Sequence, residues 1–365
     1  MQLRTAAALT SDERTLSGTT YRCARDPRKV FSVVKSVRDA LFDRRLLIVV
    51  GKGGVGKTTM ACALGLLAAQ VGKRTLLVEV DGAGRAAYLL GVQPGEIGKA
   101  RPARESLSVM SLDGSAALAE YLEMVVPVKR VLQAVFSSRI YQYFVAAAPG
   151  LKELMTIGKI WYEAERIDET TGERSWDVVV VDAPATGHSM QYLGMPHAAH
   201  EVFRSGLVGR ESQRLIDLLT DPERTAVNLV TTAEEMPVNE TLEMYQRVRE
   251  ELHMPLGWLF VNRTHQTSFD EAELERVQQR LAKSHDARER AITEEVLKRA
   301  REEAGWTVIN RTYLARLARE VDMPTVEVPF SFAEEFGAEQ VRAIASAIEP
   351  AILGSARRGK RHGRS

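Results

Sequence analysis

Short apolar runs alternate along the chain with stretches in which apolar residues recur every three or four positions. The runs are rich in valine, leucine and isoleucine, as expected for strands that are covered on both faces. The intervening stretches have the period of amphipathic helices. This alternation predicts an α/β fold with a mostly parallel, doubly wound sheet flanked by helices. The predicted strands are Leu46–Val50, Thr75–Val80, Leu107–Leu112, Asp177–Val181, Ala226–Thr231, Leu256–Val261 and Thr325–Val328.

Three stretches of the chain are longer than a simple strand-to-strand crossover requires. Residues 113–176 and about 189–222 are rich in large apolar side chains at helical spacing. These two insertions predict a helical subdomain beside the sheet. Residues 267–304 differ, because charges of both signs are dense there and apolar positions are sparse. That pattern predicts a solvent-facing, charged helical arm.

The two ends of the chain have no strand or crossover pattern. Residues 1–25 show no clear period and predict a disordered leader. The pair Asp26-Pro27 then has the order of a helix N-cap and first turn, ahead of an apolar face that ends at Leu41. Residues 355–365 contain five basic residues and no large apolar one, which predicts a disordered basic tail.

Composition narrows the class of protein. At 365 residues, with 45% apolar and 27% charged residues, the chain fits one elaborated soluble α/β domain. Forty-nine basic and 48 acidic residues leave a net charge of +1, so no specific nucleic-acid partner is expected. The sequence has no apolar run of about 18 residues and no signal-peptide pattern, which indicates a cytoplasmic protein. Two cysteines cannot build a disulfide framework or a single-chain zinc cage.

The most informative segment is glycine-rich and joins the first predicted strand to a helical pattern over Met60–Val71. Strand, glycine loop and helix N-terminus come in the order that a phosphate-binding loop requires. The glycines let several backbone N–H groups point at one anion, and the helix dipole adds positive potential. We expect Lys57 to reach the β- and γ-phosphates of ATP, and Thr58 to place its hydroxyl on Mg²⁺. The loop comprises Gly51, Lys52, Gly53, Gly54, Val55, Gly56, Lys57, Thr58 and Thr59.

Carboxylates end two of the predicted strands. Asp182 follows the run of valines, and we expect it to hold Mg²⁺ opposite Thr58, directly or through water. The Pro and Gly that follow suit a segment that changes shape with the terminal phosphate. Asp81 ends the second predicted strand, where a carboxylate can orient the attacking water and accept its proton.

These motifs resemble the ArsA and tail-anchored-protein targeting ATPases, in the deviant phosphate-loop class that also holds MinD, ParA and nitrogenase iron protein. Lys52 supplies the second lysine of that loop, and Asp182–His188 keeps the Asp and the Thr-Gly-His of the family's switch segment. Residues 149–155 are similar to a family motif between the sheet and the helical subdomain. The resemblance covers roughly residues 44–350 and identifies 26–354 as a P-loop ATPase domain.

The resemblance also implies roles for single residues. Lys52 would cross a dimer interface to the partner's bound phosphates, so a nucleotide-dependent homodimer, or a heterodimer with a paralogue, is expected. Asn262 would contact adenine, and Glu234 would approach the nucleotide across the dimer. Pro329 and Phe330 would belong to the loop that covers adenine. Capping or turn roles compete with these assignments for Glu234 and Phe330.

The expected activity is Mg²⁺-dependent ATP hydrolysis, with Lys52, Lys57 and Asp81 as the catalytic set. Hydrolysis would drive the binding and release of a client, a hydrophobic helix or a membrane protein, held by the apolar insertions. The same apolar residues also fit a plain protein core. Cys23 and Cys62 offer no grouped thiolates, so neither an arsenite site nor a zinc or iron–sulfur cluster is expected.

Two other interpretations stay open. A ParA- or MinD-like positioning ATPase would act on DNA or on a membrane surface. MinD-type anchoring needs an apolar C-terminal stripe, which residues 355–365 lack, and ParA-type binding predicts steeply salt-dependent DNA affinity. The other alternative is a scaffold that binds ATP without hydrolysing it.

Overall fold

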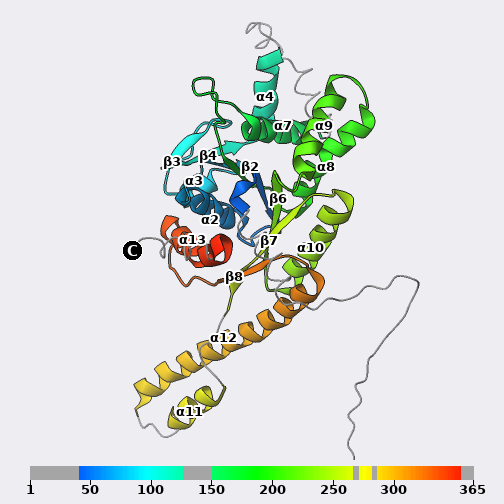
Figure 1. Ribbon diagram of the computed structural model, residues 1–365. Helices are drawn as coiled ribbons and strands as arrows, with labels where there is room; N and C mark the ends of the chain where they lie inside the picture. Colours follow the sequence, from blue (N-terminus) through cyan, green and yellow to red (C-terminus); the bar gives the residue numbers. More distant parts are fainter. Residues whose placement is uncertain (1–40, 126–149, 266–270, 282–285, 355–365) are drawn as a thin grey trace, which may run out of the picture.

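The structure, a computed structural model, describes residues 41–125, 150–265, 271–281 and 286–354. These residues form one eight-stranded sheet in the order β3-β4-β2-β5-β1-β6-β7-β8 (Figure 1). All seven predicted strands are confirmed, and their ends differ from the prediction by three residues at most. The strands are β1 (Leu46–Gly51), β2 (Thr75–Val80), β3 (Arg101–Arg104), β4 (Leu107–Leu112), β5 (Val178–Asp182), β6 (Thr225–Thr232), β7 (Leu256–Thr264) and β8 (Thr325–Pro329).

β3 is the strand that the apolar pattern did not predict. It pairs antiparallel with β4 at one edge of the sheet, whereas the other strand pairs are parallel. Its sequence is Arg-Pro-Ala-Arg and its side chains are mostly exposed, so it carries no apolar alternation. Proline and charged side chains are tolerated at a sheet edge because one side of the strand has no partner there. The predicted mostly parallel α/β fold is confirmed.

Alternate residues of the central strand β1 point into two separate cores. Leu46 and Ile48 lie in one core, and Leu47 and Val49 lie in the other. This follows from the period of two along a strand that is covered on both faces. The first face is covered by α7 (Leu151–Glu165), α8 (Thr186–Val202), α9 (Gly206–Thr220) and α10 (Glu235–Gln246), and the second by α2 (Lys57–Gln70), α3 (Arg85–Leu89) and α13 (Ala338–Leu353).

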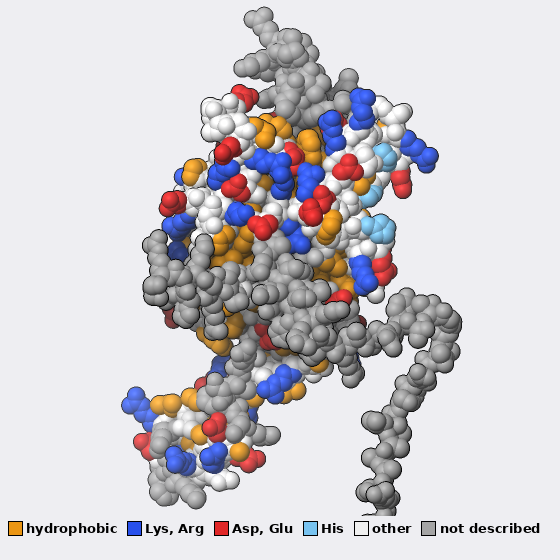
Figure 2. Space-filling view, viewed as in Figure 1, with side chains coloured by type: hydrophobic (Ala, Val, Ile, Leu, Met, Phe, Trp, Pro, Cys, Tyr) orange, Lys and Arg blue, Asp and Glu red, His pale blue; other side chains and the backbone are white. Residues whose placement is uncertain are grey.

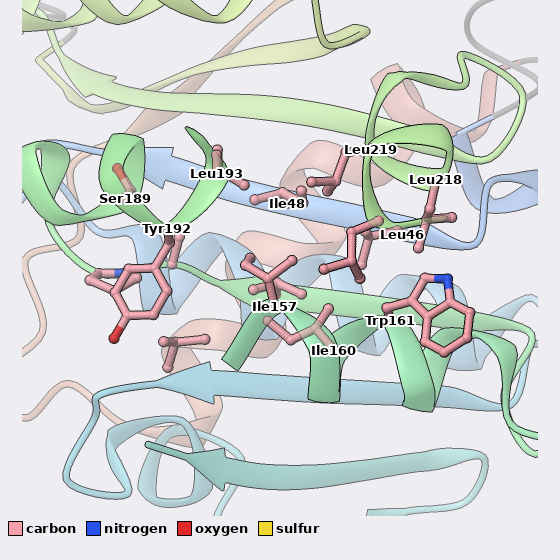
Figure 3. A pocket seen from close by; sticks show the side chains of 15 residues that line it. Leu46, Ile48, Ile157, Ile160, Trp161, Ser189, Tyr192, Leu193, Leu218 and Leu219 are labelled. Carbon is pink, nitrogen blue, oxygen red and sulfur yellow. The ribbon is translucent and has the colours of Figure 1, made fainter. Parts of the chain in front are cut away.

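The two predicted apolar insertions are helical where the structure describes them. The first insertion supplies α4 (Gly114–Val125) and α7, and the second supplies most of α8 and all of α9; residues 126–149 lie outside the described part. Ile157 and Ile160 of α7 face Leu46 of β1 across the core (Figure 3). Helices α7 to α9 are therefore a layer of the sheet domain itself, with α4 packed on α7 farther from the sheet (Figure 1).

The charged arm is a hairpin of α11 (Glu271–Leu281) and α12 (Ala287–Glu320) that extends away from the sheet (Figure 1). Helix α12 continues 16 residues beyond the predicted end of the arm at residue 304. Its C-terminal half packs against the sheet domain, where Leu317 joins the core on the first face of the sheet. The charged pattern alone gave no sign of this packing, because no proline or cap marks the point where exposed positions become buried ones.

Several predictions concern residues that the structure does not describe. The leader (residues 1–25), the helix predicted to begin at Asp26 and the tail (residues 355–365) lie outside the described residues. The last position of that helical face, Leu41, is described and is buried in the short turn η1 (Leu41–Asp43). Among the described helices, none combines the length and the apolar character that crossing a membrane requires.

Asn310 fixes the inner half of α12 to the carboxyl edge of the sheet. Its side chain is 3% exposed. The amide Nδ2 donates to the carbonyl oxygen of Ala233 at 3.1 Å, and Oδ1 accepts the backbone N–H of His265 at 2.7 Å. These two partners follow β6 and β7, so one buried amide joins three segments.

We predict that Asn310→Ala lowers the free energy of unfolding by about 2 kcal/mol, because two buried backbone groups lose their partner. Urea unfolding followed by circular dichroism measures the change. Thr312→Ala, an exposed substitution on the same helix, should change stability by less than about 0.5 kcal/mol. Equal stability of both variants would show that Asn310 does not anchor the helix.

Candidate active site

The glycine loop lies at the carboxyl edge of the sheet, between β1 and α2. Gly54 and Gly56 have φ angles of 86° and 102°, in the left-handed region that residues with a Cβ rarely adopt. Gly56 is also the N-cap of α2, so the unpaired N–H groups of the first helical turn face the loop. A Cβ on Gly56 would lie 2.2 Å from Nδ2 of Asn262. The backbone conformation and the close neighbour both require glycine here.

Lys57 lies across this loop. Its Nζ donates to the carbonyl oxygen of Lys52 at 3.1 Å and so closes the loop on itself. Burial lowers the pKa of Lys57, and the charge of Asp182 opposes that shift in part. A phosphate group bound in the loop would add the negative charge that favours the protonated amine.

Thr58 and Asp182 lie in direct contact, and their predicted hold on Mg²⁺ stays a prediction. The Thr58 hydroxyl donates to Oδ2 of Asp182 at 2.6 Å. The other carboxyl oxygen, Oδ1, is buried and has no hydrogen-bond partner among the described residues. Burial raises the pKa of Asp182 to about 7, although the Thr58 hydrogen bond and the Lys57 charge act in the opposite direction. The carboxyl group is thus held in a place where its charge is not yet compensated.

This pair fits Mg²⁺. The metal takes oxygen ligands and commonly binds proteins through one or two side chains, with waters and substrate phosphates completing the shell. The Thr58 hydroxyl and the orphaned Asp182 oxygen are donors of that kind. Within the described residues, no three or more His, Cys, Asp or Glu side chains are grouped as a metal site. The donors present therefore suit a metal held jointly with a nucleotide.

Asp81 follows β2 directly and has a left-handed φ of 52°. Its carboxylate accepts a hydrogen bond from the Tyr192 hydroxyl on α8, the helix that begins just after the segment following Asp182. The buried carboxylate of Glu79 organises the turn after Asp81 by accepting the N–H of Arg85 at 2.9 Å. A Cβ on Gly82 would lie 2.2 Å from that Glu79 side chain. The Glu79 side chain therefore holds this turn in place.

Lys52 forms an ion pair within its own chain. Its Nζ lies 2.6 Å from Oε1 of Glu240, and both side chains are about one-third exposed. Glu240 lies on α10, which covers the first face of the sheet next to the glycine loop. Lys52, which the sequence predicts to reach the phosphates of a partner molecule, is paired with Glu240 of its own chain.

The residues predicted to surround the base lie on the neighbouring strands β7 and β8. Asn262 is buried within β7, and its Nδ2 donates to the carbonyl oxygen of Val55 at 2.8 Å. Its amide therefore supports the glycine loop, and the adenine contact stays a prediction. Pro329 ends β8, and the backbone N–H of Phe330 donates to the carbonyl oxygen of Thr264 at 3.0 Å.

An aromatic row continues from Phe330 toward the arm. The rings of Phe330 and His265 stack with centroids 5.0 Å apart, and His265 stacks on Trp306 of α12 at 5.7 Å. Phe332 packs edge-on against Phe330 at 4.8 Å. Nδ1 of His265 also lies 2.9 Å from the carboxylate of Glu303. This row connects the end of β8 to the root of the arm.

Glu234 lies at the carboxyl end of β6, in the N-cap position of α10. Its side chain is exposed and makes no capping hydrogen bond there. Its predicted approach to a nucleotide across a dimer stays a prediction. Every residue assigned to the site thus lies on one edge of the sheet, in the spatial order Asp81, Asp182, the glycine loop, Glu234, Asn262 and the pair Pro329–Phe330.

Three residues at this edge were not predicted as parts of the site: Tyr192, Glu240 and His265. Tyr192 appeared in the sequence as one apolar position of a helical pattern, and Glu240 as one charge on a helix surface. Their partners lie 111 and 188 positions away along the chain. His265 directly follows a predicted strand, and that position at a carboxyl edge is the signal that would have found it.

The parallel sheet and the glycine loop between β1 and α2 together define a P-loop nucleoside triphosphatase fold. A family model described as "Anion-transporting ATPase" matches residues 44–349. The match covers most of the chain, so the protein belongs to the anion-transporting ATPase family. The resemblance stated from the sequence motifs is confirmed by this match.

Individual relatives carry ATPase names. The chain is 35% identical over 223 residues to "ATPase BagA" of Mycobacterium tuberculosis, covering 60% of this chain and 65% of that protein. It is 29% identical over 228 residues to the "Arsenical pump-driving ATPase" of Acidiphilium multivorum, covering 56% and 36%. It is 30% identical over 166 residues to "ATPase get3" of Schizosaccharomyces japonicus, covering 45% and 48%. The aligned part is less than two thirds of each of these relatives.

We predict that Asp182 makes the nucleotide-free, magnesium-free protein less stable as pH rises. Its pKa is about 7 in the folded chain, above the ordinary value of 3.8, so only the folded state keeps the proton between these values. The free energy of unfolding should therefore fall between about pH 4 and pH 7, by at most about 4 kcal/mol from this group.

Urea unfolding at pH 5, 6, 7 and 8 measures this dependence. Asp182→Asn should flatten it, because the amide does not titrate. Asp177→Asn is the control, because hydrogen bonds from Arg74 hold the pKa of Asp177 below its ordinary value and outside this window. If wild type and Asp182→Asn had the same slope, Asp182 would not be the titrating group.

Proposed function

We propose that this protein is a Mg²⁺-dependent ATPase of the ArsA and tail-anchored targeting type, acting in the cytoplasm as a dimer. The observation that carries the proposal is the Thr58–Asp182 pair at the glycine loop, with one buried carboxyl oxygen left unpartnered among the described residues. A phosphate loop alone would serve many functions. The Asp182 carboxyl group, on the neighbouring strand β5, supports a site for a nucleotide together with its metal.

The proposed chemistry divides among residues of one sheet edge. The N-terminus of α2 and Lys57 bind the phosphates and stabilise the charge that develops on the terminal group. When bound, Mg²⁺ would supply further neutralisation of the phosphate oxygens, held by Thr58 and Asp182. Asp81 orients the attacking water and accepts its proton.

Asp81 must exchange its present partner for that water. The Tyr192 hydroxyl occupies its carboxylate in the described structure. Burial and the Asp81 hydrogen bond raise the pKa of Tyr192, so the phenol keeps its proton and remains a donor. Movement of α8 after nucleotide binding would release Asp81, because α8 follows directly on the segment that begins at Asp182.

Base recognition is proposed for Asn262, Pro329 and Phe330, with Glu234 acting across the dimer. Phe330 is 37% exposed, and an aromatic ring is the kind of side chain on which a base can stack. To contact adenine, the Asn262 amide would have to release the carbonyl oxygen of Val55, which it now holds.

Lys52 is proposed to act in trans in a homodimer or in a heterodimer with a paralogue. In the single chain it is bound to Glu240, so it must leave that carboxylate to reach the partner's phosphates. The terminal phosphate offers a stronger anionic partner than one carboxylate that is about one-third exposed. ATP would therefore favour the dimer by competing with Glu240 for the lysine.

The proposed client is a hydrophobic helix or a membrane protein. Support comes from exposed apolar side chains at the end of α8, Val202 and Phe203. A ParA- or MinD-like role is the alternative. The visible face of the domain mixes acidic and basic side chains (Figure 2), and a mixed surface does not favour DNA or anionic lipid.

We predict that Asp81→Asn lowers ATP turnover by about 100-fold or more, because the water loses its base. Phosphate release measures turnover, and calorimetry with ATP and magnesium should show binding unchanged. Tyr192→Phe is the matched control, since it removes the hydrogen bond but leaves the carboxylate, and it should retain turnover. Wild-type turnover in Asp81→Asn would refute the assigned role of Asp81.

We predict that Glu240→Gln lowers the ATP concentration needed for dimer formation by about fivefold, because a partly exposed ion pair of up to about 1 kcal/mol is removed. Light scattering coupled to gel filtration measures the dimer at each ATP concentration. Lys52→Ala should abolish the ATP-dependent dimer. Glu243→Gln, an exposed change on the same helix, should have no effect. A dimer from Lys52→Ala equal to wild type would exclude the lysine from the interface.

A further inference from the structure

A cavity of about 220 Å³ lies between α4, α7 and α9, beside the core that packs on the first face of the sheet. It is separate from the glycine loop, and neither the family match nor the relatives' names assign a role to it. Most of its described lining is apolar, including Leu154, Met155, Trp161, Val208 and Leu215. An engineered apolar cavity of about 150 Å³ binds benzene, so this space can hold a larger apolar group.

A glycine in the middle of α7 borders this cavity. Gly158 lines the cavity, and a Cβ placed there would meet no described heavy atom within 4 Å. Glycine in a helix interior costs about 1 kcal/mol relative to alanine, and a larger side chain at this position would project into the open space.

The floor of the cavity carries a hydroxyl group without a protein partner. Ser212 of α9 is 1% exposed, and its Oγ has no hydrogen-bond partner among the described residues. A buried hydroxyl left unpaired costs about 1–3 kcal/mol, so a bound molecule that offers a hydrogen bond would remove that cost. The cavity therefore combines an apolar wall with one polar point of attachment.

The charged groups around the cavity are already neutralised. Nζ of Lys159 is 2.6 Å from Glu120 and 2.9 Å from Glu163. Glu163 also lies 3.4 Å from Arg166, and Glu211 lies 2.9 Å from Arg214. Each charged residue in the described lining thus has an oppositely charged neighbour. A charged ligand would lose its hydration without gaining a free counter-charge.

We propose that this cavity binds a small neutral amphiphile, a single alkyl chain whose uncharged hydroxyl-bearing head hydrogen-bonds Ser212. In proportion to benzene in the engineered cavity, the space holds about nine carbon atoms. The chain lies along Leu154, Met155 and Trp161, and the head reaches α9. The proposal does not depend on the identity of the client or on ATP hydrolysis.

The same cavity is physically connected to the candidate active site. Trp161 and Leu215 line it, and they also line a small gap of about 20 Å³ between the helices and β1. Trp161 and Tyr192 lie at opposite ends of that gap (Figure 3). Because Tyr192 holds Asp81, a molecule that moves α7 or α9 would act on the catalytic carboxylate through packed side chains.

Titration calorimetry of the full chain with 1-nonanol, nonanoate and nonylamine tests the proposal. The three probes share a chain and differ in head-group charge. We expect 1-nonanol to bind at least tenfold more tightly than either ion. Ser212→Ala should weaken 1-nonanol by about fivefold, which corresponds to one hydrogen bond of about 1 kcal/mol.

Gly158→Leu should fill the cavity and reduce 1-nonanol affinity at least tenfold, with ATP binding unchanged as evidence of folding. Gly305→Leu is the matched control, because Gly305 is an exposed helical glycine of α12 where a Cβ also meets no described atom within 4 Å. Equal affinity for the three probes, no binding of any of them, or unchanged binding by Gly158→Leu would each overturn the proposal.

Discussion

Parallel pairing of β1 with β5 and β6 is the constraint on which the rest of this structure depends. Parallel strands end at the same edge, so residues from distant parts of the chain meet there. The register that pairs Val49 with Asp182 brings the carboxyl group beside the glycine loop. The Thr58–Asp182 hydrogen bond is a direct consequence, and the buried Asp182 oxygen without a described partner follows from the same placement.

The groups of the candidate site are held by partners from their own chain. Lys57 binds a loop carbonyl, Lys52 binds Glu240, Asp81 accepts from Tyr192, and Asn262 donates to Val55. Polar groups removed from water need such partners. Under the proposed function, nucleotide binding to this protein would exchange hydrogen bonds and ion pairs, and so would tie the state of the site to α8 and α10. These two helices carry Tyr192 and Glu240.

Helix α7 contributes residues both to the sheet core and to a cavity among the helices. One face of the helix packs Ile157 and Ile160 into the sheet core. Gly158 and neighbouring residues of the same helix border a cavity with paired charges and a buried hydroxyl from Ser212. The arm differs, because its outer part has little core of its own and Asn310 fixes its root. A molecule bound in this cavity, as proposed, would touch Trp161 and Leu215, which also line the gap that Tyr192 borders.

Local sequence determined the parallel strands, the glycine loop and the two carboxylates at strand ends, because apolar runs and glycine positions act over a few residues. It did not reveal β3, whose Arg-Pro-Ala-Arg sequence has no apolar signal, or the return of α12 to the body at Leu317. The pairing of Lys52 with Glu240 joins residues 188 positions apart. Tertiary packing alone decided these features, since neither a propensity nor a spacing records which distant side chains become neighbours.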